Sequence, residues 1–124
     1  MPVSWQITNG LVLLESDEAA TFEEWREATQ GALASSSYRP GMGLVHDHRR
    51  LVRVPLAGEI EARAYYAAGQ MRAHAVRRWA LVVKGDAAFG MGRLGEALAN
   101  DTVEFRAFRE MAEAEAWARG GPVK

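Results

Sequence analysis

The chain of 124 residues contains no cysteine, which excludes disulfide bonds, thiol nucleophiles and thiolate metal sites. Its net charge is only −1 at pH 7, so no overall basic field attracts nucleic acid or an anionic membrane. No apolar run approaches the roughly 20 residues of a membrane span. The first residues lack the basic and apolar segments of a signal peptide. We therefore expect a cytoplasmic protein with no membrane span and no nucleic-acid partner.

What is present is an ordinary globular composition, 48% hydrophobic and 25% charged, and we expect a single domain over residues 1–124. Apolar and polar residues alternate over residues 3–8, which predicts a strand with one buried face. Asn9-Gly10 follows, a strong hairpin signal because both residues tolerate positive φ. Residues 11–14 are continuously apolar, which indicates a strand that is covered on both faces.

The rest of the chain alternates between helical and strand-like spacing. Thr21 and Glu24 form a capping-box pattern at the start of the first helix. A basic loop that contains Arg53 runs from the third strand to Pro55, and the segment 100–101 ends the third helix. The predicted order, β-β-α-β-α-β-α-β-α, indicates an α/β fold with a mostly parallel sheet after an antiparallel hairpin. The expected helices cover residues 22–33, 56–75, 87–98 and 111–117, and the expected strands cover 3–8, 11–14, 43–47, 79–83 and 103–107.

The end of the chain carries a resemblance to a known family. Residues 101–117 (DTVEFRAFREMAEAEAW), residues 89–93 (FGMGR) and Asp47 at the end of the third strand resemble the SpoIIAA-like family, which is related to STAS (anti-sigma-factor-antagonist) domains. The resemblance covers nearly the whole chain and implies a SpoIIAA/STAS-like fold. STAS antagonists carry a phosphorylatable Ser or Thr just after the strand-ending aspartate. Here Asp47 is followed by His48, Arg49 and Arg50, so that switch is not expected.

The same resemblance bears on assembly. In the related domains successive strands are neighbours, which places most helices on one side of the sheet. The apolar strands at residues 11–14 and 79–83 then need cover on their other face. A second subunit provides such cover, and closed two-fold dimers are the commonest arrangement. We therefore expect a homodimer.

Charged residues gather where the parallel strands end. Open α/β sheets bind ligands at these ends, which here carry Asp47, His48, Arg49, Lys84 and Asp86. These five residues are the predicted ligand-binding site, and a small anionic or polar molecule is the predicted ligand. The alternative is a solvated loop whose ion pairs contribute little.

Two further motifs have structural interpretations. Gly90, Gly92 and Gly95 match the dinucleotide-binding fingerprint in spacing, but they follow Val83 too late and fall inside a helix that Asp86 caps. We interpret them as sites of close helix–sheet packing, and we expect no cofactor.

His46 and His48 lie on one face of the third strand, with Asp47 on the other. A catalytic zinc site needs a third protein ligand, and His74 is the only other histidine. We therefore expect no metal, with His46 at the edge of the core and His48 in solvent.

Other charged and aromatic residues fit ordinary surfaces and cores. The pattern of Glu59, Glu61 and Arg63 is typical of a solvated helix face. Trp5 and Trp25 fall on predicted core faces, as does Trp117, which argues against a nucleic-acid surface.

Two functions from different classes remain open. The first is a non-enzymatic STAS-like module that binds a partner protein or a small ligand, because no catalytic constellation is recognisable. The alternative is a small enzyme or anion-binding protein that uses Asp47, His48, Lys84 and Asp86. An enzyme requires His48 to contact an acidic group and to line a pocket.

Overall fold

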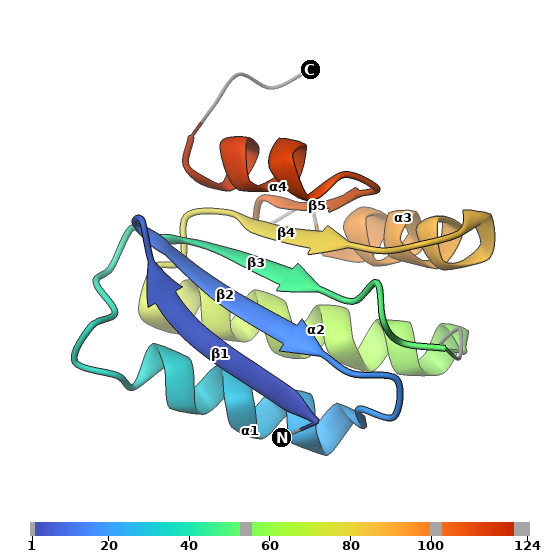
Figure 1. Cartoon of the computed structure of the whole chain (residues 1–124), viewed down its shortest axis with the longest axis horizontal. Coiled ribbons are helices and arrows are strands. Elements are labelled where there is room, and N and C mark those ends of the chain that lie inside the picture. The colour runs from blue at the N-terminus through green and yellow to red at the C-terminus, as the bar shows by residue number, and fades with distance from the viewer. Residues whose placement is uncertain (1, 53–55, 100–102, 121–124) are drawn as a thin grey trace.

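The strands and helices follow one another in the predicted order (Figure 1). The computed structural model describes residues 2–52, 56–99 and 103–120. The predictions for Arg53, Pro55 and the segment 100–101 lie outside these residues. Within them, the elements are β1 (Val3–Thr8), β2 (Leu11–Ser16), α1 (Phe22–Leu33), β3 (Gly43–Asp47), α2 (Ala57–His74), β4 (Trp79–Val82), α3 (Asp86–Ala99), β5 (Phe105–Phe108) and α4 (Met111–Ala118).

The described strands form one sheet in the order β1-β2-β3-β4-β5. Asn9 and Gly10 form the first turn with φ angles of 51° and 77°, which confirms the predicted hairpin. β1 is antiparallel to β2, and each later strand is parallel to the one before it. Because successive crossovers step in one direction, α1, α2 and α3 lie on one face of the sheet, and α4 lies on the other (Figure 1).

Alternate residues of the central strands enter two separate cores. Leu44 and Trp79 face α1 and α2, whereas Val45 and Ala80 face α4 and contact the core around Trp117. Strands β2, β3 and β4 are therefore covered on both faces. This explains the continuous apolar runs at residues 11–14 and 79–83 and confirms that these strands need cover on both faces.

Helix α4 covers the face of the sheet for which the sequence suggests a second subunit. Leu11 and Val82 are fully buried in the core that α4 completes. Arg78 fixes this helix, because its Nη1 donates to the Trp117 carbonyl at 2.8 Å and its guanidinium lies 5.0 Å from the Trp117 ring centre. At these residues α4 covers the apolar face of the sheet without a second subunit, and the homodimer stays a prediction.

Four large residues that the apolar spacing in the sequence assigns to buried faces are exposed, namely Trp5, Leu56, Leu94 and Leu98. Trp5 is 41% exposed, because it lies in edge strand β1, and its indole Nε1 lies near Gly31 of α1. Leu56 is 77% exposed, because it occupies the N-cap position of α2, before the amphipathic face begins. These placements were wrong because periodicity does not show which positions of an element the rest of the fold covers.

Local signals in the helices are confirmed. The Thr21 hydroxyl accepts from the Glu24 amide at 3.2 Å, and the Glu24 carboxylate accepts from the Thr21 amide at 2.9 Å, which completes the capping box. The glycines of the fingerprint-like string lie inside α3. A Cβ on Gly92 would lie 2.9 Å from the Ala107 Cβ, so this glycine permits the close approach of α3 to the sheet.

Candidate functional site

Two of the five predicted site residues bind each other. The Arg49 side chain donates to both carboxylate oxygens of Asp47, each at 2.9 Å, and the Arg49 amide donates to Oδ1 at 3.1 Å. Burial alone would raise the pKa of Asp47, but the hydrogen bonds and charge of Arg49 bring this pKa below its usual value. Asp47 is therefore ionised, and its negative charge is balanced by the positive charge of Arg49.

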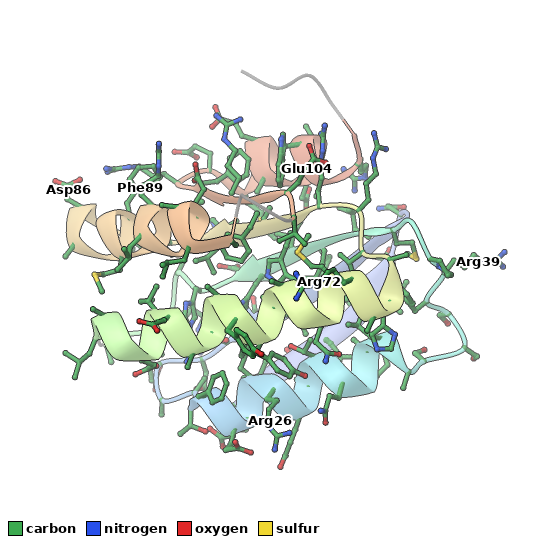
Figure 2. The ribbon with its side chains drawn as sticks, turned by 180° about the vertical axis from the view of Figure 1, so that it is seen from behind. Arg26, Arg39, Arg72, Asp86, Phe89 and Glu104 are labelled. Atoms are coloured by element: carbon green, nitrogen blue, oxygen red, sulfur yellow. The ribbon has the colours of Figure 1, made fainter. Side chains whose placement is uncertain are left out.

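The other two predicted charges lie at the start of α3 and in the turn before it. Lys84 and Asp86 are both exposed. Asp86 accepts a hydrogen bond of 2.7 Å from Arg109, whose guanidinium also lies 4.3 Å from the centre of the Phe89 ring. Asp86 and Phe89 project from the same end of the helix (Figure 2). The structure thus pairs Asp86 with a residue that the sequence analysis did not consider.

His46 in β3 and His48, which follows β3, point to the same side, as predicted from their spacing. The ring centres of His46 and His48 are 4.6 Å apart. His48 is only 8% exposed, so the prediction that it lies in solvent was wrong. Its amide continues the sheet beyond β3 by donating to the Val82 carbonyl at 2.8 Å, which holds its side chain beneath α2. No group of three or more His, Asp or Glu side chains that could hold a metal occurs in the described parts of the chain.

His46 is enclosed by three elements. Its Nε2 shares a hydrogen bond of 2.6 Å with the Oγ of Ser16 on β2. Its ring stacks on Trp25 of α1 with centres 5.8 Å apart and planes 13° apart. Burial lowers the pKa of His46 well below 6.5, and the charges of His48 and Arg63 lower it further. His46 is therefore a neutral imidazole at pH 7.

A cavity of about 40 Å³ lies beside the two histidines. It lies between the sheet on one side and α2 and α3 on the other, and these two helices lie side by side across the back of the sheet (Figure 2). Apolar side chains form most of its wall, and the polar groups come from the histidines, Arg63 and the indole of Trp25. The lining residues are Trp25, His46, His48, Ile60, Arg63, Ala64, Ala67, Trp79, Leu81, Met91, Gly92, Gly95 and Phe105.

Arg63 is the functional candidate that sequence reasoning missed. It is only 8% exposed, which corrects its interpretation as part of a solvated face. Its Nη2 donates to Glu59 at 3.1 Å, and its guanidinium lies 5.2 Å from the Trp25 ring centre. The available signal was its helical spacing, three residues after Ile60 and four before Ala67, which places it on the apolar face of α2.

Comparisons with known proteins bear on the fold. No family model matches the chain, and no curated protein matches it significantly. A crystal structure of an uncharacterised protein from Shewanella loihica PV-4, described as a DUF3478-family protein with a SpoIIAA-like fold, matches with a TM-score of 0.59. The match covers 94% of this chain and 91% of that chain at 16% sequence identity. The chain has the SpoIIAA-like fold.

The resemblance inferred from the sequence is thus confirmed for the SpoIIAA-like fold, and identity at this level extends to the fold alone. None of the described helices is long and apolar enough to cross a membrane. Within this SpoIIAA-like fold, His48 is the one predicted site residue that lines the cavity, whereas Asp47, Arg49, Lys84 and Asp86 are not among its lining residues.

Proposed function

We propose that this protein is a non-enzymatic binding module whose small ligand occupies the cavity between the sheet, α2 and α3. The observation that carries this proposal is the convergence of His46, His48 and Arg63 in a mostly apolar cavity. Small-molecule sites typically combine apolar walls with a few polar groups, and groups with shifted pKa values gather there. A buried arginine and two buried histidines are costly in a core that serves stability alone.

The size of the cavity limits the ligand. A volume of about 40 Å³ holds a few water molecules, since one water needs roughly 10–15 Å³. Pockets that enclose drug-sized ligands measure roughly 300–1,000 Å³. A larger ligand must therefore displace a side chain from the wall. Met91 is suited to this, because its unbranched thioether chain adapts to irregular spaces.

The predicted strand-end residues form the second part of the proposal. Asp47 ends β3 and faces the other side of the sheet from the cavity. We therefore propose the strand-end residues as a separate polar contact region, made of Asp47, His48 and Arg49 with Lys84 and Asp86 at the neighbouring strand end, of which only His48 also lines the cavity. The alternative function, a small enzyme or anion-binding protein, would use the same residues. We favour binding over catalysis because an enzyme would need an acidic group that orients His48. Both carboxylate oxygens of Asp47 instead accept hydrogen bonds from Arg49.

The proposal is tested by native mass spectrometry of the purified protein, followed by the same sample denatured. A bound molecule that is lost on denaturation, and that raises the melting temperature when it is added back, supports a ligand site. The same spectra measure whether the protein is the homodimer that we propose or a monomer.

Two glycine variants on α3 locate the site. A Cβ on Gly95 would lie 3.5 Å from Ile60 and 3.8 Å from Phe105, so Gly95→Ala adds a methyl group to the cavity wall without a clash. A Cβ on Gly90 would meet no atom within 4 Å, so Gly90→Ala is the matched control on the same helix. We expect Gly95→Ala to weaken ligand binding at least several-fold and Gly90→Ala to retain it. Equal binding by both variants would exclude the cavity as the site.

A further inference from the structure

The outer face of α2 carries few charged residues for a helix surface. α2 is the middle helix of the three on its face of the sheet, and Figure 2 shows it between α1 and α3. A helix face in contact with water normally carries charged and polar side chains, whereas the centre of a protein interface is poor in charge. The exposed residues of α2, of which two are charged, are Ala57, Gly58, Glu61, Ala62, Tyr65, Arg72 and Ala73. This composition is typical of a face that contacts another protein surface.

Two glycines on this face have no packing role within the described parts of the chain. Gly58 and Gly69 belong to α2, and glycine lowers helical propensity relative to alanine. A Cβ on either glycine would meet none of the described atoms around it within 4 Å. Both glycines line a groove of about 720 Å³ between α1 and α2. A second helix on this face would explain them, because small residues let two helices approach closely.

Tyr65 is the large side chain of this face. It is 82% exposed, although its ring carries an apolar surface that favours burial. The next residue, Tyr66, points the other way and packs edge-on against Trp25, with ring centres 5.4 Å apart. Tyr65 also borders the groove, so one surface carries both an exposed ring and a hollow. A surface of this kind can pack against a copy of itself.

The small residues along α2 are symmetric about the point between residues 65 and 66. Gly58 and Ala73 lie equally far from this point on its two sides, and so do Ala62 and Gly69. Helical spacing places these four residues on one stripe, which we call the small-residue stripe. In an antiparallel pair of α2 helices, each member of the stripe therefore lies opposite another small residue.

The two exposed charges complement each other in the same arrangement. Glu61 and Arg72 lie on the same side of the small-residue stripe as Tyr65, four residues before it and seven after it. An antiparallel pair brings the first half of one helix beside the second half of the other. Arg72 of each copy then lies next to Glu61 of the other copy, and the two-fold axis repeats this pair. This charge complementarity favours a second copy of the chain as the occupant of the face.

We propose that two copies of the chain associate through the outer face of α2, with the two helices antiparallel across a two-fold axis beside Tyr65. The small-residue stripes let the helices approach, the two Tyr65 rings fill the space beside the axis, and each Arg72 pairs with Glu61 of the other copy. This inference gives the predicted homodimer an interface other than the sheet face that α4 covers. It does not depend on the ligand in the cavity.

Sedimentation velocity over a concentration series tests the interface. We expect a reversible dimer, and we expect Gly69→Leu to raise its dissociation constant at least about tenfold, because the added side chain enters the interface twice. Gly90→Leu is the matched control on α3, since Gly90 is exposed and its Cβ would also meet no described atom within 4 Å. A monomer at all concentrations, or equal dimerisation of the two variants, would overturn the inference.

Exchange of the two charges tests the predicted ion pairs. We expect Glu61→Arg alone and Arg72→Glu alone each to weaken the dimer several-fold, because each variant places like charges beside one another at two symmetric positions. The variant that carries both substitutions places opposite charges there again and should recover the dimer. A double variant that dimerises no better than the single variants would contradict this pairing.

Disulfide cross-linking reports the direction of the two helices, because the unmodified chain contains no cysteine. A disulfide requires Cα atoms within about 7 Å of each other. We expect separately prepared Ala62→Cys and Gly69→Cys chains to cross-link with each other after mixing and oxidation, more than either does with itself. Cross-linking of Ala62→Cys mainly with itself would overturn the antiparallel arrangement.

These outcomes are distinct from the test of the ligand. A dimer that Gly69→Leu leaves intact would overturn the α2 interface and retain the homodimer, whereas a monomer would overturn both. Neither result bears on the cavity, which Gly95→Ala tests.

Discussion

At the scale of single residues, the unusual feature is a neutral histidine in the centre of the sheet. His46 is 1% exposed, hydrogen-bonded to Ser16 and stacked on Trp25. A buried imidazole with these contacts is tolerated because its polar atom is satisfied and its ring packs as an aromatic group. The cost appears only when it must accept a proton, which burial, His48 and Arg63 all oppose.

Acid should therefore destabilise the fold through His46. Its pKa is about 6.5 in the unfolded chain and lower in the fold, so below pH 6.5 the unfolded chain binds more protons. The free energy of unfolding should fall as pH drops from about 6.5 to 5, by at most about 1.4 kcal/mol per pH unit for this group. Urea unfolding at several pH values measures this slope.

The variant His46→Gln should flatten the slope over that range, even if the variant is less stable at every pH. Asp47 has a lowered pKa and contributes to acid sensitivity only near and below pH 3.8, so the two effects are separable. An unchanged slope in His46→Gln would contradict the assignment.

At the scale of elements, α3 is a helix that gains packing at the expense of helical propensity. It contains three glycines, each of which costs roughly 1 kcal/mol in a helix relative to alanine. Gly92 permits the close approach of α3 to Ala107. Gly90 is exposed, and a Cβ at this position would meet no atom within 4 Å. The same residue type therefore has opposite consequences two positions apart.

Alanine at these positions should shift stability in opposite directions. Gly90→Ala should stabilise the protein by roughly 0.5–1 kcal/mol, because helical propensity improves and no atom lies near the new methyl group. Gly92→Ala should destabilise it by roughly 1–3 kcal/mol, because its Cβ would lie 2.9 Å from the Cβ of Ala107. Thermal unfolding of both variants tests this, and a stabilised Gly92→Ala would show that α3 is free to shift.

Elements were also the level at which the sequence was most informative. Period-two alternation, the Asn9-Gly10 turn and the Thr21 capping box depend on neighbours in the chain, and the structure confirms all of them. The burial of His48 depends on where α2 crosses the sheet, which no local pattern encodes, whereas the burial of Arg63 follows the helical spacing of its apolar neighbours. We therefore predicted that His48 and Arg63 lie in solvent, although the fold buries them, and the cavity between them was not predicted.

At the scale of the whole molecule, the sheet ends at β1 and β5, and the edge at β5 is protected. The Ala107 amide, which points away from β4, donates to the carboxylate of Glu96 on α3 at 3.1 Å. Arg93 holds this carboxylate in place at 3.5 Å. A side chain from α3 thus occupies a position that another strand would need for pairing.

Removing this cap should promote self-association. We expect Glu96→Ala to raise the weight-average mass above that of the unmodified protein at equal concentration, because the amide of Ala107 becomes available for a second chain. Sedimentation velocity across a concentration series measures the effect. Glu113→Ala, which removes the same charge from the exposed face of α4, is the control. Indistinguishable mass distributions for the two variants would show that Glu96 does not guard the edge.

The order of strands in the sheet is the order of strands in the chain, and this has a consequence for synthesis on the ribosome. Each parallel strand pairs with the one translated just before it, so the growing sheet always presents the edge that the next strand requires. None of the strands in the described residues must wait for a distant segment to emerge. Among the described elements, α4 completes the cover of β3 and β4 on this face, so the apolar face stays open until α4 has been translated.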